Sequence, residues 1–150
     1  MDALEAVRVR EIVDLVGPFL TFSPATGGAA VAKATGISPP LDVYAVLDGT
    51  KHICGIITTD ELAILASEPE MLLLVTASDL MRPIVSVGLD DDVHTALAAM
   101  VKHGIRQLPV TDADGCFVGI VDEAAIAKAY LSSQRPKRSD VRHDSMPPGR

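Results

Sequence analysis

The chain has 150 residues, a formal net charge of −7 and 48% hydrophobic residues, of which few are aromatic. Acidic side chains outnumber basic ones 18 to 8 in residues 1–131, whereas residues 132–150 carry 2 acidic and 5 basic side chains. An acidic body repels a phosphate backbone, two cysteines are too few for a disulfide framework, and no apolar run is long enough to cross a bilayer. These features exclude a nucleic-acid partner, a disulfide-stapled fold and a transmembrane segment within this chain.

One segment of the sequence is present in two similar copies. Residues 46–57 align without a gap on residues 110–121, an offset of 64 positions. Each copy reads as an apolar strand, a polar turn and a second apolar strand with a glycine that leads towards a helix. A half-size unit of this kind cannot bury a sheet face alone, so the two copies are expected to pack into one body.

In chain order, the first half is predicted to form a helix (8–15), a strand (19–22), a helix (25–35), a hairpin (43–47 with 53–58) and a helix (60–66). A linker over residues 68–76 joins the halves. The second half is predicted to form a helical turn (77–81), a strand (84–87), a helix (93–101), a hairpin (107–111 with 116–121) and a helix (123–131). Residues 132–150, which are rich in proline and basic side chains, are predicted to form a flexible tail.

Two acidic runs invite comparison with metal sites. Asp90-Asp91-Asp92 precedes the predicted helix 93–101, where carboxylates cap free N–H groups. Asp112-Ala113-Asp114-Gly115 begins like a calcium loop but lacks oxygen ligands further on, so it is interpreted as a turn. No metal site is predicted. The sequence also contains no Ser/His/Asp or Cys/His arrangement, so an enzyme is not expected.

Three motifs of the second half resemble the cystathionine-beta-synthase-type repeat, or CBS domain: residues 78–83 (Ser-Asp-Leu-Met-Arg-Pro), 103–110 (His-Gly-Ile-Arg-Gln-Leu-Pro-Val) and 115–121 (Gly-Cys-Phe-Val-Gly-Ile-Val). The first half shares the ending of this pattern in residues 55–62. The resemblance implies a tandem pair, or Bateman module, of the α/β (α+β) class, with two β-α-β-β-α repeats related by pseudo-twofold symmetry. The implied repeats are 7–67 and 77–131, and such modules usually form homodimers.

A narrower resemblance concerns residues 62–65, 74–83 and 126–131, which are similar to the cytoplasmic C-terminal CBS pairs of bacterial voltage-gated chloride channels. It implies a regulatory module at the cytoplasmic face of the membrane, attached to the membrane domain of a parent channel.

In the CBS family, a hydroxyl three residues after the strand glycine contacts a phosphate, and an acid six residues after it holds ribose. The matching residues of the first half are Thr58 and Glu61, with Asp60 one residue early, so AMP, ADP or ATP is the implied regulatory ligand. In the second half Asp122 and Ala125 stand at these positions, which predicts a degenerate site without phosphate. An alternative stays open, in which Thr58 only caps its helix.

Two functions are therefore predicted. The first is a ligand-sensing regulatory module. The second is a ligand-free dimerisation or interaction module, either of a stand-alone CBS protein or of another effector.

Overall fold

The computed structural model describes residues 7–37 and 41–134, so the predicted tail lies outside the described residues from position 135 onward. The described helices and strands, together with the 3-10 helices η2 and η3, follow in the order η2 (Val9–Glu11), α1 (Gly28–Ile37), β1 (Val43–Leu47), β2 (Ile53–Thr58), α2 (Thr59–Ser67), η3 (Pro69–Leu73), α3 (Ala77–Leu80), β3 (Val87–Gly88), α4 (Val93–His103), β4 (Gln107–Thr111), β5 (Phe117–Asp122) and α5 (Glu123–Gln134). The mixed α/β class predicted from the sequence is confirmed.

The duplicated segment forms two equivalent antiparallel hairpins. In the first, β1 pairs with β2 so that Val46 lies opposite Gly55. In the second, β4 pairs with β5 so that Val110 lies opposite Gly119. In both hairpins the register shifts at the next residue, Leu47 or Thr111. The predicted bounds of β1, β2 and β4 are confirmed to the residue, because alternating apolar residues and a polar turn fix both register and length.

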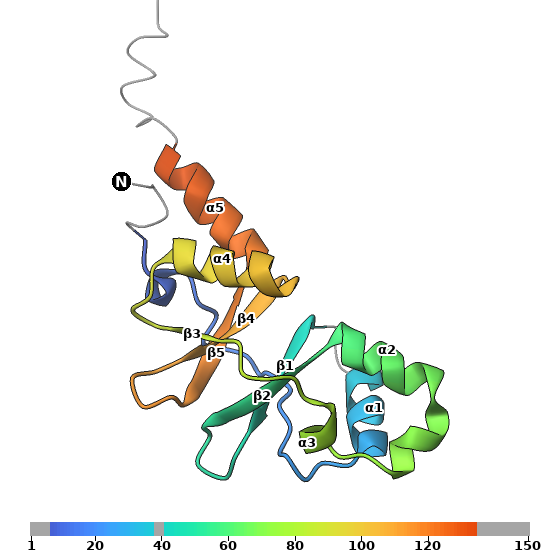
Figure 1. Cartoon of the computed structure of the whole chain (residues 1–150). Helices are drawn as coiled ribbons and strands as arrows, with labels where there is room; N and C mark the ends of the chain where they lie inside the picture. Colours follow the sequence, from blue (N-terminus) through green and yellow to red (C-terminus); the bar gives the residue numbers. More distant parts are fainter. Residues whose placement is uncertain (1–6, 38–40, 135–150) are drawn as a thin grey trace, which may run out of the picture.

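Short bridges extend both hairpins in the same way. Phe22 lies parallel to Val46 at the outer edge of the first hairpin, as β3 lies parallel to β4 in the second. On the other edge, Arg82 bridges Ile56, and Asp14 bridges Ile120. Figure 1 shows the two hairpins side by side, with α1 and α2 at one end of the molecule and α4 and α5 at the other.

Each half sends its leading segment, residues 7–16 or 75–84, into the opposite half. Val9 and Arg10 donate backbone hydrogen bonds to Asp91 and Leu89, which precede α4, at 2.8 Å each. Ala77 and Ser78 donate equivalent bonds to Thr26 and Pro24, which precede α1, at 2.7 and 2.9 Å. Figure 1 accordingly shows the blue N-terminal segment beside α4 rather than beside α1.

The glycine that the two copies share marks where this exchange crosses each sheet. A Cβ at Gly55 would lie 2.8 Å from the carbonyl oxygen of Arg82 and 2.6 Å from the sulfur of Met81. A Cβ at Gly119 would overlap the carbonyl oxygen of Asp14. The absent side chain is what lets the opposite leading segment pair with Ile56 or Ile120.

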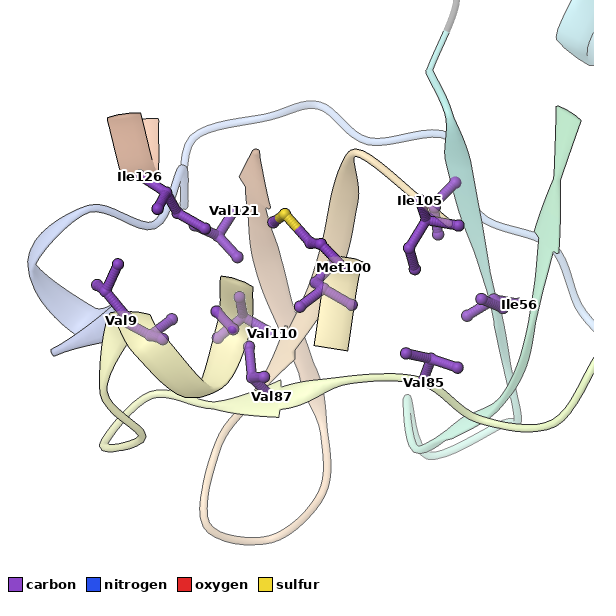
Figure 2. Packing of buried hydrophobic residues seen from close by; sticks show 13 residues of the cluster. Val9, Ile56, Val85, Val87, Met100, Ile105, Val110, Val121 and Ile126 are labelled. Atoms are coloured by element: carbon purple, nitrogen blue, oxygen red, sulfur yellow. The ribbon is translucent and has the colours of Figure 1, made fainter. Parts of the chain in front are cut away.

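The core contains residues from both halves. Val9, from the first leading segment, is fully buried among residues of the second half, as Figure 2 shows. Ile56 of β2 joins the same cluster together with Val85 and Ile105. In return Ala77 is fully buried in the smaller cluster of Phe22, Val31, Tyr44, Val46 and Ile57. Burying these apolar groups together is what holds the halves in one body.

The predicted helix 8–15 is wrong beyond a single turn. Only Val9–Glu11 is helical, in the 3-10 form, because the backbone of Asp14 exchanges hydrogen bonds of 2.9 and 3.1 Å with Ile120. The predicted strands 19–22 and 84–87 are also too long, since the chain crosses between sheets there and pairs only at Phe22 and from Val87 onward. Tertiary pairing overrides the local pattern in all three segments.

Substitution of Gly55 by alanine tests the crossing. We expect Gly55→Ala to lower the free energy of unfolding by about 1–3 kcal/mol, because the new methyl group must displace the Arg82 backbone. Gly49→Ala is the matched control, since a Cβ there meets nothing within 4 Å, and it should change stability by less than about 0.5 kcal/mol. Chemical denaturation measures both, and equal effects would refute the close approach.

Candidate functional site

A cavity of about 250 Å³ opens between the two halves. The first half contributes Asp42, which precedes β1, and the N-terminus of α2. The second half contributes the turn that follows α4. The lining residues are Asp42, Thr58, Thr59, Asp60, Gly104, Ile105 and Arg106. We call this cavity the Thr58 cleft. Thr58 and Asp60 of the predicted site therefore line one cavity, whereas Glu61 is not among its lining residues.

Thr58 is the N-cap of α2, and its buried hydroxyl group is hydrogen-bonded. Only 2% of Thr58 is exposed. Its backbone N–H and its hydroxyl both donate to Glu61 Oε1, at 2.7 and 2.8 Å. The hydroxyl oxygen accepts the Asp60 N–H at 3.2 Å. This reciprocal arrangement is a capping box, which stabilises the first turn of α2.

Arg82 reaches the same helix end from the leading segment of the second half. Its Nη2 donates to Thr58 Oγ1 at 3.1 Å, to Asp60 Oδ2 at 3.2 Å and to Glu61 Oε2 at 2.8 Å. Its Nε donates to the same Glu61 oxygen at 3.2 Å. The guanidinium thus joins all three predicted site residues and ties them to the chain that crosses Gly55.

The charges of this network reinforce one another. Burial raises the pKa of Glu61, but the hydrogen bonds from Arg82 and Thr58 outweigh it and hold this pKa below the ordinary glutamate value. The hydrogen bond to Glu61, together with the charges of Glu61 and Asp60, raises the pKa of Arg82 despite partial burial. Glu61 and Arg82 are therefore a charged pair at neutral pH, with side chains that are 14% and 27% exposed.

The second half uses its corresponding residues differently. Asp122 accepts the N–H of Ala125 at 2.8 Å and so serves as a helix cap. Asp14, which bridges Ile120 as Arg82 bridges Ile56, accepts the N–H of Val16 at 2.9 Å. This half therefore places a carboxylate where the first half has a guanidinium.

Sequence reasoning missed three residues of the site. Asp42 and Arg106 line the Thr58 cleft, and Arg82 donates a hydrogen bond to Thr58, which also lines it. The signal for Arg82 and Arg106 was present in the motifs at 78–83 and 103–110, but only the fold brings them to the Thr58 end of α2.

The two acidic runs form a helix cap and a turn, as predicted. Asp92 caps α4 by accepting the Thr95 N–H at 2.7 Å, and Gly104 ends that helix with a φ of 66°. Asp112 Oδ1 accepts the N–H groups of Asp114 and Cys116 within its turn. Across residues 7–37 and 41–134 there is no group of three or more His, Cys, Asp or Glu side chains that could hold a metal ion, and no helix in those ranges is long and apolar enough to span a membrane.

Comparison with known proteins agrees with this architecture. The sequence model of the CBS domain matches residues 77–132. The fold is that of a CBS domain pair. CBSX2 in complex with AMP has a TM-score of 0.71 and 21% identity, over 86% of this chain and 99% of that one. The CBS domain of a bacterial CNNM/CorC family Mg²⁺ transporter in complex with ATP gives 0.71 and 19%, over 85% and 89%.

Two further similarities concern the CBS domain pair of MJ0100 and a sequence relative. The MJ0100 pair, in complex with 5′-methylthioadenosine and S-adenosyl-L-methionine, has a TM-score of 0.68 and 21% identity, over 84% of this chain and 97% of that one. The uncharacterized protein MK0525 of Methanopyrus kandleri is 41% identical over 69 residues, which cover 45% of this chain. These residues span only 35% of that relative's length.

Acidification tests the Arg82–Glu61 pair. Because Glu61 has a lowered pKa in the folded chain, the unfolded chain binds its proton first. The contribution of Glu61 to stability is therefore complete above the ordinary value of 4.5 and is lost as the pH falls through the lower pKa of the folded state. Glu61→Gln should flatten this part of the profile of unfolding free energy against pH, and so should Arg82→Met. Unchanged slopes in both variants would contradict the pairing.

Proposed function

We propose that this CBS domain pair is a regulatory module that binds an adenosine-type ligand in the Thr58 cleft. The observation that supports this proposal best is that the cleft is lined by both halves, through α2 on one side and the turn after α4 on the other. A ligand held there contacts both halves at once, so its binding energy can change their relative arrangement. The proposed action is regulation of an attached effector rather than catalysis.

The complexes of similar fold support the ligand class. Those proteins are described with AMP, with ATP, and with 5′-methylthioadenosine and S-adenosyl-L-methionine, which share the adenosine group. In this chain, Asp60 and Asp42 supply carboxylates to the cleft that can accept hydrogen bonds from ribose hydroxyls. The cleft wall at Ile105 supplies an apolar surface for a base.

The proposed effector is a membrane protein, with the module on its cytoplasmic side. The resemblance of residues 62–65, 74–83 and 126–131 to chloride-channel CBS pairs supports a chloride channel as the parent protein. One protein of similar fold belongs to a Mg²⁺ transporter family, which supports ion transport as the wider context. A stand-alone CBS protein is the alternative for the same module.

A second candidate function is dimerisation without a ligand, and a separate observation favours it. An apolar groove of about 590 Å³ follows α4 and α5, lined by Leu97, Glu123, Ala124, Ile126, Ala127 and Tyr130. Beside it, Val101 and Leu131 are 74% and 56% exposed. Exposed apolar surface of this kind favours contact with a second copy of the same face.

Calorimetric titration with AMP, ADP, ATP and 5′-methylthioadenosine tests ligand binding. We expect at least one of them to bind the unmodified chain. Thr59→Trp should abolish binding, because the indole fills the cleft from an exposed position at the start of α2. Ala63→Trp, which is exposed on the same helix but does not line the cleft, should retain it. No heat from any compound at millimolar concentration would refute the proposal.

Sedimentation velocity tests dimerisation. Val101→Glu should weaken self-association about tenfold or more, because a charge is then desolvated at an apolar contact. Leu73→Glu is the matched control, since Leu73 is 86% exposed on η3, which packs against α1 and α2 at the end of the molecule opposite α4 and α5. Equal association constants for both variants would refute this interface.

A further inference from the structure

The Thr58 cleft has no free hydroxyl donor at the position where the family pattern places a phosphate contact. A threonine hydroxyl has one donor and two acceptor sites. In this structure the donor is used by Glu61 Oε1 at 2.8 Å, and the two acceptor sites are used by the Asp60 N–H at 3.2 Å and Arg82 Nη2 at 3.1 Å. Thr58 is also buried, so water does not compete for these bonds.

The Nε and Nη2 groups of the nearby Arg82 guanidinium are also hydrogen-bonded. Arg82 donates to Glu61 through two nitrogens and to Asp60 through one, and it is not among the residues that line the cleft. Both oxygens of Glu61 are likewise occupied, by Thr58 on one side and Arg82 on the other. A ligand phosphate would have to displace Glu61 or Asp60 from these bonds before it could pair with Arg82 Nε or Nη2.

Two of the three charged side chains that line the cleft are acidic. Asp42 and Asp60 line it, and the Asp60 side chain is 81% exposed. Among the residues that the structure describes, Asp42 forms no ion pair. Arg106 is the cationic member of the lining set, but its charge is shared with Glu123, whose Oε1 lies 3.6 Å from Arg106 Nε. Carboxylates next to a bound phosphate repel it, and the repulsion grows with each added phosphate charge.

We propose that the Thr58 cleft selects an adenosine-type ligand whose 5′ substituent carries no net negative charge. The carboxylates of Asp42 and Asp60 accept hydrogen bonds from the ribose hydroxyls and attract a cationic substituent, while they repel mono- and polyphosphates. This inference rests on the proposed function, because it specifies the charge class of the ligand for the same cleft.

Competitive calorimetry with four probes tests the charge preference: 5′-methylthioadenosine is neutral, S-adenosyl-L-methionine is cationic, and AMP and ATP are anionic. We expect the neutral or cationic probe to bind about tenfold or more tightly than ATP, with AMP between them. Lowering the ionic strength should widen the gap, because screening weakens the repulsion. AMP or ATP binding more tightly than both other probes would overturn the charge preference and leave the regulatory proposal intact. No binding by any of the four would overturn both.

Asp60→Asn and Asp42→Asn give an independent readout. Each removes one negative charge from the lining without a large change in shape, so each should raise the affinity for AMP relative to 5′-methylthioadenosine by about fivefold. Glu70→Gln is the matched control, because it makes the same charge change on η3, outside the cleft. The ratio should stay constant in that variant. A ratio that is unchanged in both aspartate variants would overturn the inference.

Discussion

The exchange of leading segments is the constraint on which this structure depends. Residues 7–16 complete the second half, and residues 75–84 complete the first, through backbone hydrogen bonds that repeat in equivalent positions. Each half therefore lacks an edge of its sheet and part of its core without the other. The site depends on the same exchange, because Arg82 reaches Thr58 and Glu61 only from the segment that crosses Gly55.

The proposed ligand would act on the arrangement of the two halves through this exchange. The N-terminus of α2 is held to the second half by the Arg82 side chain, and the backbone of Arg82 is held to β2 by two hydrogen bonds with Ile56. A ligand that rearranges the contacts of Asp60 acts on the same cross-connection. A regulatory effect requires that the ligand bind one arrangement of the two halves more tightly than another.

The two halves share a backbone plan but differ in their chemistry. Thr58 and Arg82, which meet at β2, correspond to Asp122 and Asp14, which meet at β5. A hydroxyl and a guanidinium at one crossing are thus replaced by two carboxylates at the other. The fold tolerates this change because both Thr58 and Asp122 still cap the following helix. From Asp122 and Ala125, the sequence predicted a degenerate second site. The further loss of the guanidinium could not be seen before the fold aligned Asp14 with Arg82.

The sequence by itself determined the duplicated hairpins, the glycine that they share and the helices that follow them, because these features depend on local alternation, turn residues and caps. It also identified Thr58, Asp60 and Glu61 as neighbours at a helix start. Only the tertiary structure decided that residues 12–16 are not helical. It also decided that Arg82 donates hydrogen bonds to all three of those residues at the helix start, and that Asp42 and Arg106 line the cleft with Thr58 and Asp60. These contacts join residues that are distant in the chain. A local sequence pattern does not show them, because their free energy comes from pairing with the opposite half.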